Sequence, residues 1–73
     1  MYNIELQYKD FKGMVCTSDR QHADQCMVGL IQSLRFKYED VADNAMTVYF
    51  NKLRNEDSVY YVKGGLCLII KEG

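Results

Sequence analysis

The sequence predicts an α+β domain with the element order ββαβββ, in which a single amphipathic helix covers one face of a mainly antiparallel sheet. Three observations lead to this prediction. Apolar and polar residues alternate in several short segments, one longer segment has apolar residues at helical spacing, and glycines separate some of these segments. The chain has 73 residues, of which 48% are hydrophobic, so we expect residues 1–73 to form one small domain.

The first two predicted strands form a hairpin. Apolar and polar side chains alternate from Tyr2 to Tyr8, and this period of two is typical of a strand with one buried face. The polar turn KDFKG follows. We expect Met14–Thr17 to return beside the first strand as its antiparallel partner.

The predicted helix covers about residues 19–36. Its apolar residues recur every three or four positions, and they are Ala23, Cys26, Met27, Leu30, Ile31 and Leu34. Ser18 with Gln21 three residues later matches a capping box, which predicts where the helix begins.

Three further strands are predicted after a connecting loop. Residues 37–45 are polar and acidic, and we interpret them as the loop, in which Glu39–Asn44 can form a short helical turn. Met46–Asn51 alternates as a strand does, whereas residues 58–63 are rich in β-branched and aromatic side chains. Gly64 and Gly65 allow a tight hairpin into the last strand, at residues 66–70.

The predicted packing leaves one sheet face without a helix. The residues expected in the core are Ile4, Leu6, Val48, Phe50, Leu66, Leu68 and Ile70. On the opposite face we expect exposed tyrosines, namely Tyr49 and either Tyr60 or Tyr61. Tyrosine combines a large contact area with a polar tip and is enriched at protein interfaces, although strands also favour it.

Composition excludes several classes of protein. The formal net charge is −1 and the isoelectric point is about 5.7, so the overall charge gives no reason to expect nucleic-acid binding. No segment has the roughly 20 apolar residues of a membrane span, and the N-terminus lacks the pattern of a signal peptide. Three cysteines without an export signal indicate free thiols and a cytoplasmic location.

The segment CTSDRQHADQC suggests a metal site or a redox pair at first sight. Zinc sites usually contain two closely spaced ligand pairs, whereas Cys16 and Cys26 are far apart and no second pair follows. Cys26 belongs to the apolar stripe of the helix, where a free thiol packs as a small hydrophobic side chain. His22 lies at the edge of that stripe. We therefore expect no metal, no cofactor and no catalytic residue, and we classify the protein as a non-enzyme.

In its small size, acidity, α+β composition and lack of catalytic groups, the chain resembles small phage proteins that block host machinery, including anti-CRISPR proteins. This resemblance implies a protein-binding inhibitor of a host nucleic-acid-handling or defence complex. Acidic turns and an exposed tyrosine-bearing sheet face would bind a basic surface of the target. The residues expected to contact the partner are Glu39, Asp40, Asp43, Tyr49, Glu56, Asp57 and Tyr60.

Two alternatives belong to other functional classes. The first is a small nucleic-acid-binding regulator, in which bases stack on tyrosines flanked by basic residues. The residues it requires are Tyr49, Tyr60, Tyr61, Lys52, Arg54 and Lys63. The second is a self-associating structural protein, which would form a homodimer through a sheet edge or a sheet face.

Overall fold

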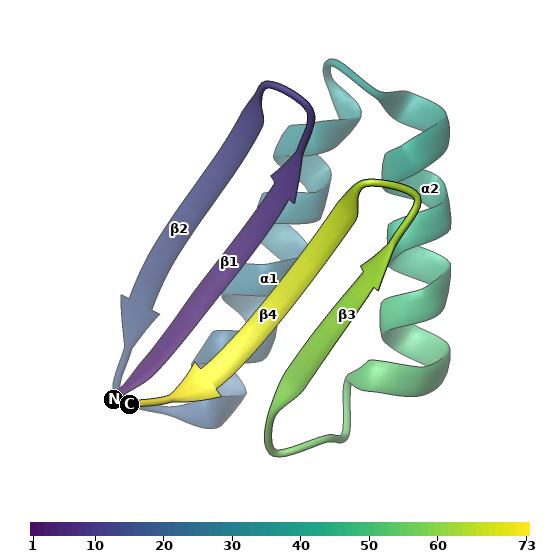
Figure 1. The fold of residues 1–73 in the computed structure, drawn as a ribbon. Helices are drawn as coiled ribbons and strands as arrows, with labels where there is room; N and C mark the ends of the chain where they lie inside the picture. Colours follow the sequence, from purple (N-terminus) through teal and green to yellow (C-terminus); the bar gives the residue numbers. More distant parts are fainter.

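The computed structural model describes residues 1–73 as a sheet layer packed on a helix layer (Figure 1). The elements in chain order are β1 (Tyr2–Tyr8), β2 (Phe11–Thr17), α1 (Arg20–Arg35), α2 (Glu39–Val48), the π-helical segment η1 (Tyr49–Leu53), β3 (Val59–Lys63) and β4 (Leu66–Glu72). The predicted α+β class is confirmed. The prediction of one helix and five strands is wrong, because the order is ββααββ.

The sheet is antiparallel throughout, in the order β2-β1-β4-β3. Its two hairpins meet along the central pair, β1 and β4. The chain termini therefore lie side by side, and the Gly73 amide donates to the Met1 carbonyl at 3.0 Å (Figure 1). The two edge strands are β2 and β3.

Two tight turns set the strand registers. Gly64 and Gly65 have φ angles of 60° and 84°, so the predicted glycine hairpin is confirmed. The first turn contains only Lys9 and Asp10, and β2 therefore begins at Phe11, three residues before the predicted start. Gly13 lies inside β2, and a Cβ at this position would be 2.5 Å from the Cδ2 atom of Leu30. The missing side chain thus allows α1 to approach the sheet closely.

Helix α1 agrees with the predicted helix except at its cap. The N-cap is Asp19 instead of Ser18, because the Asp19 side chain accepts a hydrogen bond from the Gln21 amide at 3.2 Å. The predicted apolar stripe is confirmed: Ala23, Met27, Ile31 and Leu34 are buried, and Cys26 and Leu30 are half-buried.

The second helix occupies residues that were predicted to be a loop and a strand. Ala42, Ala45 and Tyr49 are buried at spacings of three and four residues, as expected for one face of a helix. At the end of η1 the Arg54 amide donates to the Tyr49 carbonyl at 2.9 Å, five residues back. This helical conformation leaves Val48 half-buried and Phe50 40% exposed, so their prediction as core residues is wrong.

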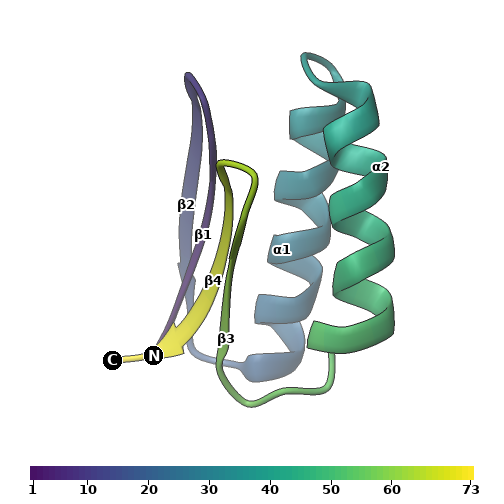
Figure 2. The ribbon, with the colours of Figure 1, turned by 45° about the vertical axis from the view of Figure 1, so that its right-hand side comes forward.

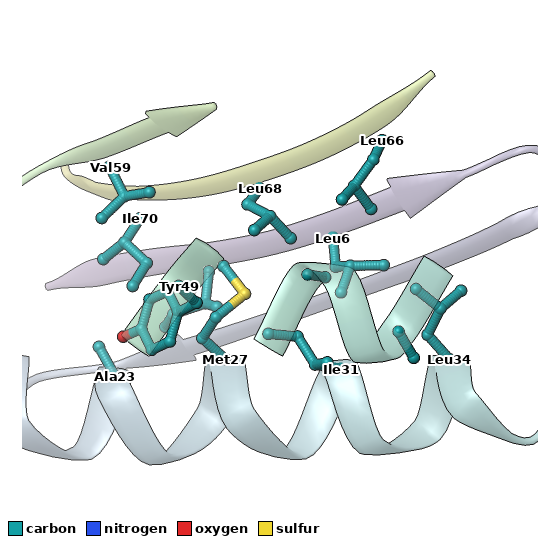
Figure 3. Close-up of a cluster of buried hydrophobic side chains, with 13 residues drawn as sticks. Leu6, Ala23, Met27, Ile31, Leu34, Tyr49, Val59, Leu66, Leu68 and Ile70 are labelled. Atoms are coloured by element: carbon teal, nitrogen blue, oxygen red, sulfur yellow. The ribbon is translucent and has the colours of Figure 1, made fainter. Parts of the chain in front are cut away.

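The core lies between the two layers (Figure 3). Five predicted core residues on the central strands β1 and β4 are confirmed as buried, and these are Ile4, Leu6, Leu66, Leu68 and Ile70. Tyr49 joins this cluster from the helix layer (Figure 3). Neither helix is long and apolar enough to cross a membrane.

Candidate functional site

The sheet has one face that no helix covers, because α1 and α2 both pack on the other face (Figure 2). The strand registers identify the side chains on this open face, since they alternate with the buried ones. They are Asn3, Glu5, Gln7, Lys12, Met14, Cys16, Tyr60, Val62, Cys67, Ile69 and Lys71.

An apolar patch occupies the β3–β4 half of the open face, and it consists of Tyr60, Val62, Cys67 and Ile69. Tyr60 pairs with Ile69 across the two strands, and Val62 pairs with Cys67. The exposed fraction is 78% for Tyr60 and 56% for Val62. Large apolar side chains clustered at such exposure are typical of a contact surface.

Polar residues divide this patch from the rest of the open face. Glu5 on β1 stands opposite both Ile69 on β4 and Met14 on β2, and Met14 is 60% exposed.

Partial burial and the nearby Glu5 carboxylate raise the pKa of the Cys67 thiol. Cys67 therefore contributes to the patch as a neutral, apolar thiol at physiological pH.

The two predicted contact tyrosines lie in different environments. Tyr60 is on the open face, whereas Tyr49 is fully buried, so the prediction that Tyr49 is exposed is wrong. The Tyr49 hydroxyl donates to the Asp24 carboxylate at 2.5 Å. Burial and this carboxylate raise the pKa of Tyr49 to about 12, which keeps the phenol protonated in the core.

The predicted acidic residues form two separate groups. Glu39, Asp40 and Asp43 are exposed on α2, where Asp43 makes an ion pair with Arg35 at 3.6 Å. Glu56 and Asp57 lie in the connection from η1 to β3, at the opposite end of the helix layer (Figure 1). Glu39, Asp40 and Asp43 therefore lie on the layer opposite the face that carries Tyr60, and no single flat contact can include both.

The six residues required by the nucleic-acid alternative are not gathered on the sheet face. Only Tyr60 is on the open face, because Tyr61 points towards the helix layer, and Lys52 and Arg54 lie in or beside η1. Arg54 pairs with Asp24 at 3.2 Å and lies 4.6 Å from the centre of the Phe50 ring. The predicted array on the sheet face is therefore wrong, whereas Lys52, Tyr61 and Lys63 line one groove between α2 and the β3–β4 hairpin.

The residues of CTSDRQHADQC are also separated. The Cys16 thiol, on the open face, donates to the Asn3 side-chain oxygen at 3.0 Å. Cys26 packs against the core from α1, on the other side of the sheet, and His22 Nδ1 is 3.3 Å from the Thr17 hydroxyl. All three cysteines are free, so this segment ends β2 and begins α1 without bringing its thiols together.

A groove that the sequence did not predict lies between α2 and the β3–β4 hairpin. Its volume is about 480 Å³. Helix α2 and η1 contribute Val41, Asn44, Val48 and Lys52, and the hairpin contributes Tyr61 and Lys63. These four residues of α2 and η1 share one helix face at spacings of three and four residues, a signal that becomes visible only when residues 39–53 are recognised as helical.

Comparison with protein-family models, with curated proteins and with solved structures finds no match for this chain.

Proposed function

We propose that this chain is a non-enzymatic protein-binding module, and that its contact surface is the open sheet face. The observation that carries the proposal is the apolar patch, in which Tyr60 and Val62 remain 78% and 56% exposed. Tyrosine is enriched among the few side chains that carry most of the binding energy of protein interfaces, and burial of apolar surface around it adds to that energy.

The charges of this face favour a protein partner over a nucleic acid. Lys12 and Lys71 are the only cations among its side chains, and Glu5 is a carboxylate near the centre. Binding to phosphates requires a surface that is much more positive. A folded partner with an apolar patch and a few polar groups matches this face better.

Inhibition of a host nucleic-acid-handling complex is one activity that such a module would have. In that version of the proposal, the open face holds the target, and Glu39 and Asp40 stay outside this contact because they lie on α2 in the helix layer.

The proposal is tested by a comparison of variants in a capture experiment. The tagged chain and its Tyr60→Glu variant are incubated with a nuclease-treated lysate of cells that naturally contain the chain. A captured protein is then purified, and its affinity for each variant is measured by calorimetry. We expect Tyr60→Glu to weaken binding at least tenfold, equivalent to about 1.4 kcal/mol.

The double variant Glu39→Lys/Asp40→Lys is the matched control, since it changes exposed residues on the helix layer. We expect its affinity to stay within twofold of the wild type. Equal affinity of Tyr60→Glu and wild type would contradict the assignment of the open face. Loss of binding only in the α2 variant would assign the contact to the acidic residues instead.

A further inference from the structure

We propose that the β3 edge and the adjoining groove form a strand-addition site for an extended segment of another polypeptide, one that carries an acidic side chain. This inference rests on the proposed function, because it specifies how a protein partner is held. It concerns a different surface from the open face, namely the free side of β3 and the groove beneath α2.

The free side of β3 offers unpaired backbone groups. Strand β3 pairs only with β4, through a two-residue turn at Gly64 and Gly65. Hydrogen-bonded pairs in such a hairpin alternate outward from the residues that flank the turn. The amide and carbonyl groups of Tyr60 and Val62 consequently face away from β4, where an added strand can bind them.

The groove provides space for the side chains of that added strand. It runs along α2 and η1 from Asp40 to Lys52, a helical distance of about 18 Å. Five or six residues of extended chain have the same length at about 3.3 Å each. Alternate side chains of the added strand would enter the groove over Tyr61 and Leu66, and the others would lie beside Tyr60 and Val62 on the open face.

The charge of the groove favours an acidic segment. Lys52 and Lys63 both line it, and neither takes part in the ion pairs of the fold. Asp40 is the one carboxylate in the lining, so the groove has a net positive charge. A carboxylate that enters the groove would gain a charge-assisted hydrogen bond from one of the two lysines in a partly enclosed site.

A second copy of this chain fits the site less well. The only charged residue of β2 is Lys12, and the only charged residue of β3 is Lys63. Neither edge strand of a second copy supplies an acidic side chain, and pairing of β3 with itself would add a second Lys63 to a site that already has Lys52 and Lys63. We therefore assign the site to a different polypeptide.

The probe for this site is a displayed library of random octapeptides, selected on the folded chain. We expect the enriched peptides to alternate apolar and polar residues and to carry an acidic residue in the alternation. Synthetic copies should bind Lys52→Glu/Lys63→Glu at least tenfold more weakly than wild type. The variant Lys12→Glu/Lys71→Glu, which removes the same number of cations from the open face, should bind them within twofold.

Two further measurements test the backbone pairing. Val62→Pro removes one outward-facing amide and leaves the pairing with β4 in place. We expect it to lower the affinity of the peptides for the protein tenfold. N-methylation of alternate peptide amides should also lower the affinity tenfold. This change leaves the protein unaltered, so the test does not depend on the folding of a variant.

Three results would overturn the proposal: no enrichment, enriched peptides that are basic, or affinities unchanged in both the charge-reversal and the proline variant. A wild-type dimer by light scattering that Val62→Pro converts to a monomer would assign the edge to a second copy. A protein partner that loses affinity for Tyr60→Glu but binds Val62→Pro normally would leave the proposed function intact and reject strand addition.

Discussion

The Tyr49 side chain shows how a single residue can connect the two helices of this fold. Its ring is buried in the core, and its hydroxyl donates to Asp24 of α1 at 2.5 Å. The same carboxylate forms an ion pair at 3.2 Å with Arg54, the residue that follows η1. A phenol thus satisfies a partly buried carboxylate while its ring fills space among the aliphatic side chains.

Replacement of Tyr49 by phenylalanine keeps the ring and removes the hydroxyl. We expect Tyr49→Phe to lower the free energy of unfolding by about 1–2 kcal/mol at pH 7, because Asp24 loses a charge-assisted hydrogen bond. Urea unfolding followed by circular dichroism measures the difference.

The same variant has a defined pH dependence. The folded-state pKa of Tyr49, about 12, is above its ordinary value of 10.0, so folding favours the protonated phenol. This contribution is present below pH 10 and is lost as the pH rises from 10 to 12. The stability difference between wild type and Tyr49→Phe should therefore decrease over this interval, and a constant difference would contradict the assignment.

At the scale of elements, residues 39–53 are the segment in which pattern and structure disagree. Met46–Asn51 alternates in polarity over six residues, which is too short a window to distinguish a strand from part of a helix. The helical spacing of Ala42, Ala45 and Tyr49 begins before this window. Packing of that face against α1 and the sheet outweighs the strand preference of Thr47 and Val48.

Substitution of Thr47 tests this helical conformation through the direction of the change in stability. It is exposed on α2, and its hydroxyl donates to the Asp43 carbonyl at 3.1 Å, four residues back. We expect Thr47→Ala to raise the free energy of unfolding by about 0.5 kcal/mol, because alanine has the higher helix propensity. In a strand the same substitution would be destabilising, so the direction of the change measured in urea decides between the two.

At the scale of the whole molecule, polar contacts hold a chain connection against the helix layer at each end of the fold. At one end, Asp10 in the β1–β2 turn accepts hydrogen bonds from Lys37 and from the Tyr38 hydroxyl, the latter at 2.6 Å. At the other end, Arg20 of α1 donates to the Glu56 carbonyl at 2.7 Å and to the Arg54 carbonyl at 3.1 Å. These contacts fix the chain connections around the core.

The Asp10 contacts should appear in the acid stability of the protein. Hydrogen bonds from Lys37 and Tyr38 lower the pKa of Asp10 to about 2, from an ordinary 3.8. A lowered folded-state pKa stabilises the fold above pH 4, and this contribution disappears as the pH falls towards 2. We expect the urea midpoint of Asp10→Asn to fall less than that of wild type between pH 4 and pH 2. Parallel curves for the two proteins would contradict this role.

The sequence by itself determined the α+β class, the β1–β2 and β3–β4 hairpins, and the apolar face of α1. In β1 and α1 the local period continues through the whole element, and in the second hairpin Gly64 with Gly65 specifies the turn between two apolar segments. Five core residues on β1 and β4 were predictable for the same reason. Of the candidate contact surface, the sequence predicted that either Tyr60 or Tyr61 is exposed, because only one sheet face can pack on the helices, and the structure exposes Tyr60.

The tertiary structure alone decided the second helix, the burial of Tyr49 and the separation of the acidic residues. Each depends on contacts between residues distant in sequence, such as Tyr49 with Asp24, which no local period encodes. The groove beside β3 has the same origin. It exists because α2 packs beside α1 and over the last hairpin, which places Lys52 and Lys63 in the lining of one cavity.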